Sequence, residues 1–133
     1  MRSFKLNLLI IILIPVLSIS LLAENDNLYD LQGAEYLAFT DQMPEPIGGL
    51  PAIYKLIEYP EMAKRAGVEG KVYVLAFINE EGGVDDVKVV KGIGAGCDEA
   101  TIEAVKKTKF NPGQAAGKPT KVKMSLQIQF KLS

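Results

Sequence analysis

The chain has 133 residues, room for one small domain and a targeting segment, and its 15 basic and 16 acidic side chains give a net charge of −1. The absence of histidine excludes Ser-His and Cys-His catalytic pairs and imidazole zinc ligands within the chain. The single cysteine, Cys97, excludes an internal disulfide and a multi-cysteine metal site. An enzymatic function is therefore disfavoured but not excluded, because a lysine or a carboxylate can also act as a catalytic base.

The first 23 residues have the pattern of a bacterial export signal. Arg2 and Lys5 precede a mainly apolar run that starts at Leu8, and a polar stretch follows it. The run has 16 residues, whereas roughly 20 span a bilayer comfortably. Two interpretations stay open: a cleaved signal peptide, or a signal anchor in which residues 6–23 hold the protein at the inner membrane. Both place the remaining chain in the periplasm.

Residues 24–49 predict a linker. The part from 24 to 45 has six acidic residues and no basic one, and the stretch ends in the turn-rich Met43–Gly49. In contrast, residues 104–133 have seven lysines and no acid. This division of charge has two interpretations: solvated ends, or a lysine-rich end that receives an acidic or extended partner. Nucleic acid is not expected, because there is no arginine cluster and the chain is exported.

The predicted domain, residues 50–133, opens with two short helices. The first, over residues 50–56, has a proline in its first turn. The second starts at Pro60 and is closed by Gly67, with acid near its start and base near its end. These capping signals predict two separate helices before the first long strand.

Three strands and a longer helix complete the predicted domain. Residues 69–79 are apolar on both faces, as in a covered strand, and a hairpin returns through 84–91. A helix follows over about 98–108. Residues 121–132 alternate strictly between apolar and polar, which indicates a strand with one face to water. The order α-β-β-α-β predicts an α+β fold: a two-layer sandwich of a three-stranded antiparallel sheet and two helices on one face. Such a sheet exposes at least one strand edge.

The sequence GIGAGCDE, residues 92–99, places Cys97 at the start of the predicted helix, where the pKa of a thiol can fall. Cys97 is therefore either a nucleophile or a small core residue. No base is evident for it, and the glycines match no phosphate-binding motif. The adjacent Asp85 and Asp86 would point to opposite faces of a strand, so they are not expected to share a site. We predict no catalytic, metal-binding or cofactor-binding residue.

Several short motifs occur in a fixed order before the alternating last strand: Tyr59-Pro60, Glu69-Gly70, Gly82 with Val84, Cys97-Asp98-Glu99-Ala100, Phe110-Asn111-Pro112-Gly113 and Gly117-Lys118-Pro119. Each is weak alone. Together, over residues 57–133, they resemble the C-terminal domain of TonB, which couples inner-membrane energy to outer-membrane receptors.

The resemblance implies a periplasmic binding domain without cofactor or catalysis. In the family, the TonB box of an outer-membrane receptor docks as an extra strand beside the last strand of the domain. Carried over, the partner-binding residues are Tyr59, Pro60, Lys121, Lys123, Ser125, Gln127 and Gln129. Two other interpretations stay open, because edge lysines also deter unwanted pairing and Tyr59-Pro60 also suits a helix start with a buried tyrosine.

This chain departs from TonB in three respects. The family's transmembrane helix carries a histidine that works with the ExbB-ExbD motor, and a long proline-rich spacer follows. Here the apolar segment has no histidine, and the spacer of about 22 to 26 residues reaches at most about 70–90 Å. Ala76 occupies a position that is often a bulky aromatic, and we expect Phe77 to replace it by repacking.

Three hypotheses follow from these patterns. The first is a strand-binding TonB-like protein, with an ExbB-ExbD-type motor as a further partner if it is anchored. The second is an assembly module whose edge pairs with a second copy to form a homodimer. The third is an enzyme that uses Cys97.

Overall fold

The computed structural model describes residues 35–133. The predicted signal or anchor, residues 1–23, lies outside the described residues, as does the linker before residue 35. Within 35–133, no helix is both long and apolar enough to cross a membrane. The folded unit begins at Tyr36, whereas the sequence pattern predicts a domain that begins at residue 50.

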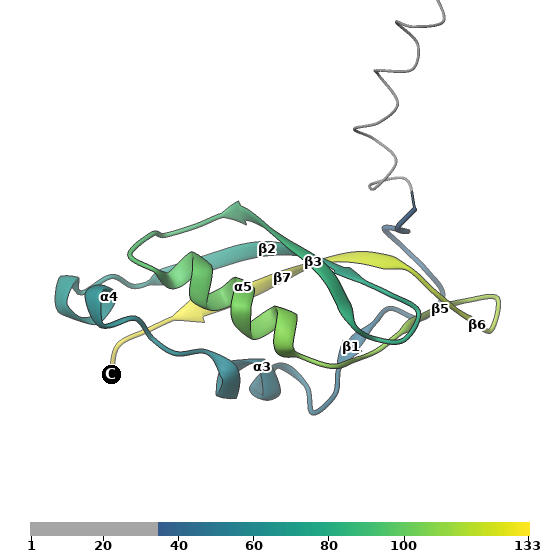
Figure 1. Cartoon of the computed structure of the whole chain (residues 1–133), viewed down its shortest axis with the longest axis horizontal. Coiled ribbons are helices and arrows are strands. Elements are labelled where there is room, and N and C mark those ends of the chain that lie inside the picture. Colours follow the sequence, from purple (N-terminus) through teal and green to yellow (C-terminus); the bar gives the residue numbers. More distant parts are fainter. Residues whose placement is uncertain (1–34) are drawn as a thin grey trace, which may run out of the picture. The chain divides into compact units, whose positions relative to one another are not determined.

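The centre of the fold is a three-stranded antiparallel sheet (Figure 1). Strand β2 (Gly70–Ile78) lies between β3 (Val84–Lys91) and β7 (Val122–Phe130). The pairing of β2 with β7 runs without a shift over all nine residues of each strand. The long alternating segment therefore forms an edge strand, as predicted.

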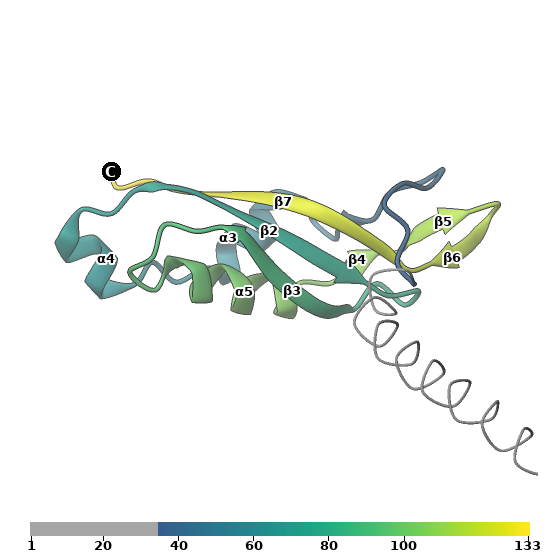
Figure 2. The ribbon, with the colours of Figure 1, turned by 90° about the horizontal axis from the view of Figure 1, so that it is seen from above.

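Three helices lie in the described part of the chain: α3 (Leu50–Leu56), α4 (Glu61–Ala66) and α5 (Cys97–Lys107). Helix α5 packs against β2, β3 and α3, and Figure 2 shows α3 and α5 on the same side of the sheet. Gly67 closes α4 in the left-handed conformation that its sequence position predicts. The predicted α+β two-layer fold is confirmed, and the three helices lie at the three segments where the sequence predicts them.

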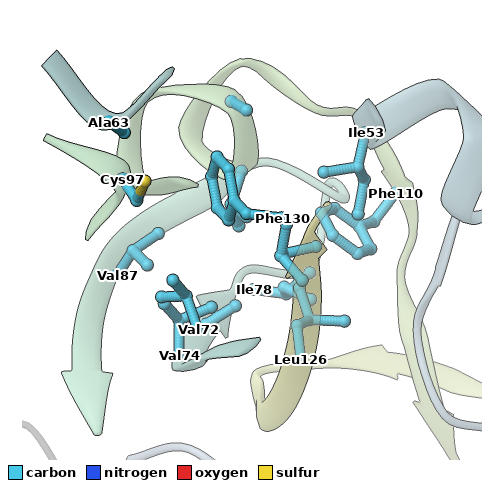
Figure 3. Packing of buried hydrophobic residues seen from close by; sticks show 14 residues of the cluster. Ile53, Ala63, Val72, Val74, Ile78, Val87, Cys97, Phe110, Leu126 and Phe130 are labelled. Carbon is cyan, nitrogen blue, oxygen red and sulfur yellow. The ribbon is translucent and has the colours of Figure 1, made fainter. Parts of the chain in front are cut away.

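The core lies between the sheet and the helices. Alternate residues of β2 and β7 are buried in one cluster with residues of α5, so a period of two in the sequence buries one face of each strand. Each large aliphatic or aromatic side chain buried in this way stabilises the fold by about 1.5–3 kcal/mol. Figure 3 shows this cluster, which includes Ile53, Ala63, Val72, Val74, Ile78, Val87, Cys97, Phe110, Leu126 and Phe130.

Phe77 does not take the place of the bulky aromatic side chain that the family often has at the position of Ala76. Ala76 belongs to the core cluster, whereas Phe77 packs edge-to-face against Tyr36 with ring centroids 5.1 Å apart. Adjacent residues of a strand point to opposite faces, so repacking of Phe77 into the core was a wrong expectation.

Cys97 is fully buried at the start of α5, and Figure 3 shows its sulfur within the core. Burial raises the pKa of the thiol, and the charges of Asp98 and Glu99 raise it further. The carboxylate of Asp98 accepts hydrogen bonds from the backbone N–H groups of Ile93, at 2.9 Å, and Gly94, at 3.3 Å. The glycine-rich loop is therefore folded around Asp98, and Cys97 fits the structural interpretation.

Four short strands that the sequence pattern did not predict lie at one end of the sheet. Strand β1 (Glu45–Pro46) pairs with β4 (Phe110–Asn111), and β5 (Gly113–Ala115) pairs with β6 (Lys118–Thr120). The β1–β4 pair holds the segment that precedes α3 against the segment that follows α5, and the β5–β6 pair lies within the latter segment.

Residues 36–46, here called the strap, lie along the domain. Leu37 forms a parallel bridge with Val122, and Gln42 forms an antiparallel bridge with Gln114. The strap ends in β1. This part of the predicted linker therefore contributes main-chain hydrogen bonds to the domain.

Candidate strand-binding edge

The outer edge of β7 is defined by its contact with the strap. The N–H of Leu37 donates to the carbonyl of Lys121, and the N–H of Lys123 donates to the carbonyl of Leu37, both at 2.9 Å. The backbone groups of these two lysines thus point away from β2. Since main-chain groups alternate along a strand, the odd-numbered residues of β7 present theirs to the outer edge.

The far end of this edge is in contact with α3. The N–H of Gln129 donates to the hydroxyl of Tyr54 at 3.0 Å. Between the strap and Tyr54 lie Ser125 and Gln127, whose outward backbone groups have no hydrogen-bond partner in the described part of the chain. We call the outward main chain of Ser125 and Gln127 the open edge.

The opposite edge of the sheet, β3, is less suited to pairing. The register of β2 with β3 shifts twice, near Tyr73 and near Phe77, and such bulges twist an edge away from a regular partner. Exposed charged side chains also line β3, at Asp85, Lys88 and Lys91. The regular β7 is therefore the edge on which a further strand fits best.

The predicted partner-binding residues of the last strand lie together along this edge. Ser125, Gln127 and Gln129 are exposed, whereas Lys121 and Lys123 are half-buried. The ammonium of Lys121 lies 5.5 Å from the centre of the Tyr36 ring, a distance at which a cation is attracted to an aromatic face. Lys121 is thus engaged by the strap, while the other polar side chains extend along the helix-free face of the sheet.

Tyr59 lies under the end of β7 rather than on the open edge. Its ring packs edge-to-face on Phe130 with centroids 5.3 Å apart, and its hydroxyl donates to the carbonyl of Val68. Burial raises the pKa of Tyr59, with smaller contributions from the charges of Cys97 and Glu69. This geometry ties the start of α4 to the end of the sheet.

Pro60 is the N-cap residue of α4. It lines a hollow of about 650 Å³ on the helical side of the domain, which α5 also borders. Four glutamates and two lysines line the hollow, at Glu58, Glu61, Glu99, Glu103, Lys64 and Lys107. No metal-binding cluster of His, Cys, Asp or Glu occurs among residues 35–133.

Sequence reasoning missed two residues at the edge, Leu37 and Tyr54. Tyr54 is 75 positions away from its partner Gln129, and Leu37 lies in the stretch that was predicted to be a linker. Leu37 contacts the edge through its backbone N–H and carbonyl, and Tyr54 through its hydroxyl, so no apolar periodicity marks either residue.

Residues 55–132 match the family described as Gram-negative bacterial TonB protein C-terminal. The chain belongs to this family. The resemblance drawn from the sequence motifs is thereby confirmed. The family transduces energy for transport in the Gram-negative envelope and is not a family of enzymes.

Known relatives are similar over the same part of the chain. Protein TonB of Pseudomonas aeruginosa is 36% identical over 61 residues, which are 45% of this chain and 18% of the relative. Protein tonB2 of the same species is 34% identical over 77 residues, 57% of this chain and 28% of the relative. The chain thus spans less than a third of the length of these relatives.

Two solved structures are also similar. The solution NMR structure of the Pseudomonas aeruginosa TonB CTD has 30% identity and a TM-score of 0.47, covering 57% of this chain and 78% of that one. The NMR structure of the Helicobacter pylori TonB-CTD has 35% identity and a TM-score of 0.47, covering 61% and 86%.

Proposed function

We propose that this protein is a TonB-like binding domain of the periplasm. It accepts an extended segment of an outer-membrane receptor, the TonB box, as a fourth strand beside β7, and so contributes to TonB-dependent transport. The observation that carries this proposal is the open edge: two consecutive outward-facing residues, Ser125 and Gln127, without a main-chain partner in the described structure.

The energetics favour a main-chain mode of recognition. Each hydrogen bond to the edge contributes a net of about 0.5–1.5 kcal/mol, and β-augmentation derives much of its affinity from such bonds. The pairing of β7 with β2 has no register shift, so the edge is free of bulges. An added strand would therefore meet donors and acceptors at the regular spacing of a sheet.

The location of the protein in the envelope and its source of energy are part of the same proposal. Residues 6–23 either direct export and are removed, or hold the protein at the inner membrane. In the second case an ExbB-ExbD-type motor is a candidate partner. Intact mass and membrane partition of the protein from its native envelope separate the two cases.

Substitution of one edge residue tests strand addition directly. Gln127→Pro removes an outward N–H, and proline is tolerated on an edge strand when that N–H faces away from the sheet. Gln127→Thr is the matched control, since it changes the side chain and keeps the N–H. We expect a TonB-box peptide to bind wild type and Gln127→Thr similarly and Gln127→Pro much more weakly, as measured by NMR titration.

The contrary outcomes are also distinct. Equal binding to all three proteins would show that the peptide binds elsewhere. Concentration-dependent mass without peptide, abolished by Gln127→Pro, would show instead that the edge pairs with a second copy of the chain.

A further inference from the structure

Both ends of the open edge are closed by the chain itself. At one end the carbonyl of Leu37 accepts the N–H of Lys123, and at the other the hydroxyl of Tyr54 accepts the N–H of Gln129. In a sheet, these two N–H groups would donate to carbonyls of a neighbouring strand. Leu37 thus pairs with the edge as a strand one residue long, and the Tyr54 hydroxyl takes the place of a strand carbonyl.

The Leu37 end is firmly held. Tyr36 packs on Phe77, and its hydroxyl donates to the carboxylate of Asp85. On the other side of Leu37, the N–H of Gln42 donates to the carbonyl of Gln114 at 3.1 Å, and the N–H of Gln114 donates back at 2.8 Å. Leu37 lies between these attachments, so an incoming strand would have to detach the strap to replace it.

The Tyr54 end is held more lightly. Helix α3 is anchored by the buried Ile53, but the Tyr54 side chain remains 41% exposed. In the described structure, one hydrogen bond joins its hydroxyl to β7. Rotation of an exposed side chain takes only picoseconds to nanoseconds, so this end can open without unfolding the domain.

We propose that the chain sets the length of strand that it accepts, with Leu37 as a fixed stop and Tyr54 as a displaceable cap. This inference rests on the proposed strand addition at β7. A short extended segment pairs with Ser125 and Gln127 and leaves both ends in place. A longer segment also pairs with Gln129, and its carbonyl displaces the Tyr54 hydroxyl.

The partner that fits is therefore an extended peptide. A longer peptide pairs beyond Gln127 toward the C-terminus of β7, and does not pair beyond Lys123 toward its N-terminus. Its binding carries a cost that depends on length, because the Gln129 bond to Tyr54 must be exchanged for one to the peptide. The cap selects against long strands that pair poorly at this last position. It also shields the Gln129 N–H while no partner is present.

Two capped peptides of alternating threonine and valine, of five and eight residues, test this proposal with the full-length protein. The variant Tyr54→Phe keeps the ring and removes the competing hydroxyl. We expect it to bind the eight-residue peptide about two- to tenfold more tightly than wild type, the range for one hydrogen bond, and the five-residue peptide equally. Lys55→Ala, which changes the exposed neighbour of Tyr54 on α3 and keeps the Tyr54 hydroxyl, is the control and should change neither affinity.

The result separates this inference from the proposed function. Amide protection at Ser125 and Gln127 on adding either peptide reports strand addition itself, and its absence overturns both proposals. If that protection appears but Tyr54→Phe binds the longer peptide equally or more weakly, the cap is overturned and strand addition stands. The N–H of Leu37 donates to the carbonyl of Lys121, so loss of Leu37 amide protection in the complex would show that the strap is displaced and would overturn the role of Leu37 as a stop.

Discussion

The hydroxyl of Tyr54 accepts a hydrogen bond from the backbone N–H of Gln129, 3.0 Å away and 75 positions later in the chain. A side chain of α3 thus occupies a main-chain position on the edge of the sheet. At the other end, the carbonyl of Leu37 accepts a hydrogen bond from the N–H of Lys123. The edge of β7 is therefore divided into two occupied positions and an open edge between them.

This division predicts a pattern of amide hydrogen exchange in the protein without a partner. Slow exchange is expected for Lys123 and Gln129, whose N–H groups are bonded, and fast exchange for Ser125 and Gln127, whose N–H groups point to solvent. Tyr54→Phe should accelerate exchange at Gln129 and leave Lys123 unchanged. Exchange measured by NMR checks all four amides at once, and equal rates for them would contradict the division.

The contact of Tyr36 with Phe77 predicts that the strap contributes to stability. Tyr36→Ala removes the aromatic pair and the hydrogen bond to Asp85, so we expect the free energy of unfolding to fall by about 1–3 kcal/mol. Phe39→Ala is the control from the same segment: Phe39 is 87% exposed, and its loss should cost less than about 0.5 kcal/mol. Urea denaturation measures both, and equal effects would mean that the strap is not held by Tyr36.

The same contact predicts a pH dependence. The hydrogen bond from Tyr36, and then the one from Asn79, hold the pKa of Asp85 below its usual value. A carboxyl with a lowered pKa in the folded state stabilises the fold above its unfolded pKa, near about 4. That contribution is lost as the pH falls through the folded pKa, so stability should decrease below about pH 4.

Tyr36→Phe checks this assignment, since it removes the first of the two donors and keeps the ring on Phe77. We expect the pKa of Asp85, followed by NMR of its carboxyl carbon, to rise in the variant. The acid-dependent loss of stability should become smaller. An unchanged pKa would show that the hydrogen bond from Tyr36 does not contribute.

The strands of the sheet could be predicted well from the sequence, because the pattern that marks a strand lies within the strand itself. Alternation over residues 121–132 identifies β7 and its buried face, since a period of two is a property of one strand. The strand predicted over residues 84–91 coincides with β3. Residues 69–79 were harder to interpret, because a strand that is apolar on both faces does not show which face Phe77 belongs to.

The two residues that bound the open edge could not be predicted in this way. The strap has no period, because it is held through backbone groups and single side chains such as Tyr36. Helix α3 was predicted, but the direction of Tyr54 depends on how α3 packs against α5. Lys121 through Gln129 were therefore predicted from the strand pattern and the family resemblance, while Leu37 and Tyr54 required the structure.

Complete burial of Cys97 predicts an unreactive thiol. Its pKa is raised by burial and by the neighbouring carboxylates, and the thiolate is the reactive form, so a water-soluble thiol reagent should modify it only after unfolding. Cys97→Ala should lower stability by about 1–2 kcal/mol, because it leaves a small cavity, and should leave peptide binding intact. Cys97→Ser should be at least as destabilising, since it buries a hydroxyl in an apolar site. Rapid labelling of the folded protein at neutral pH would contradict the buried position and reopen the question of a nucleophile.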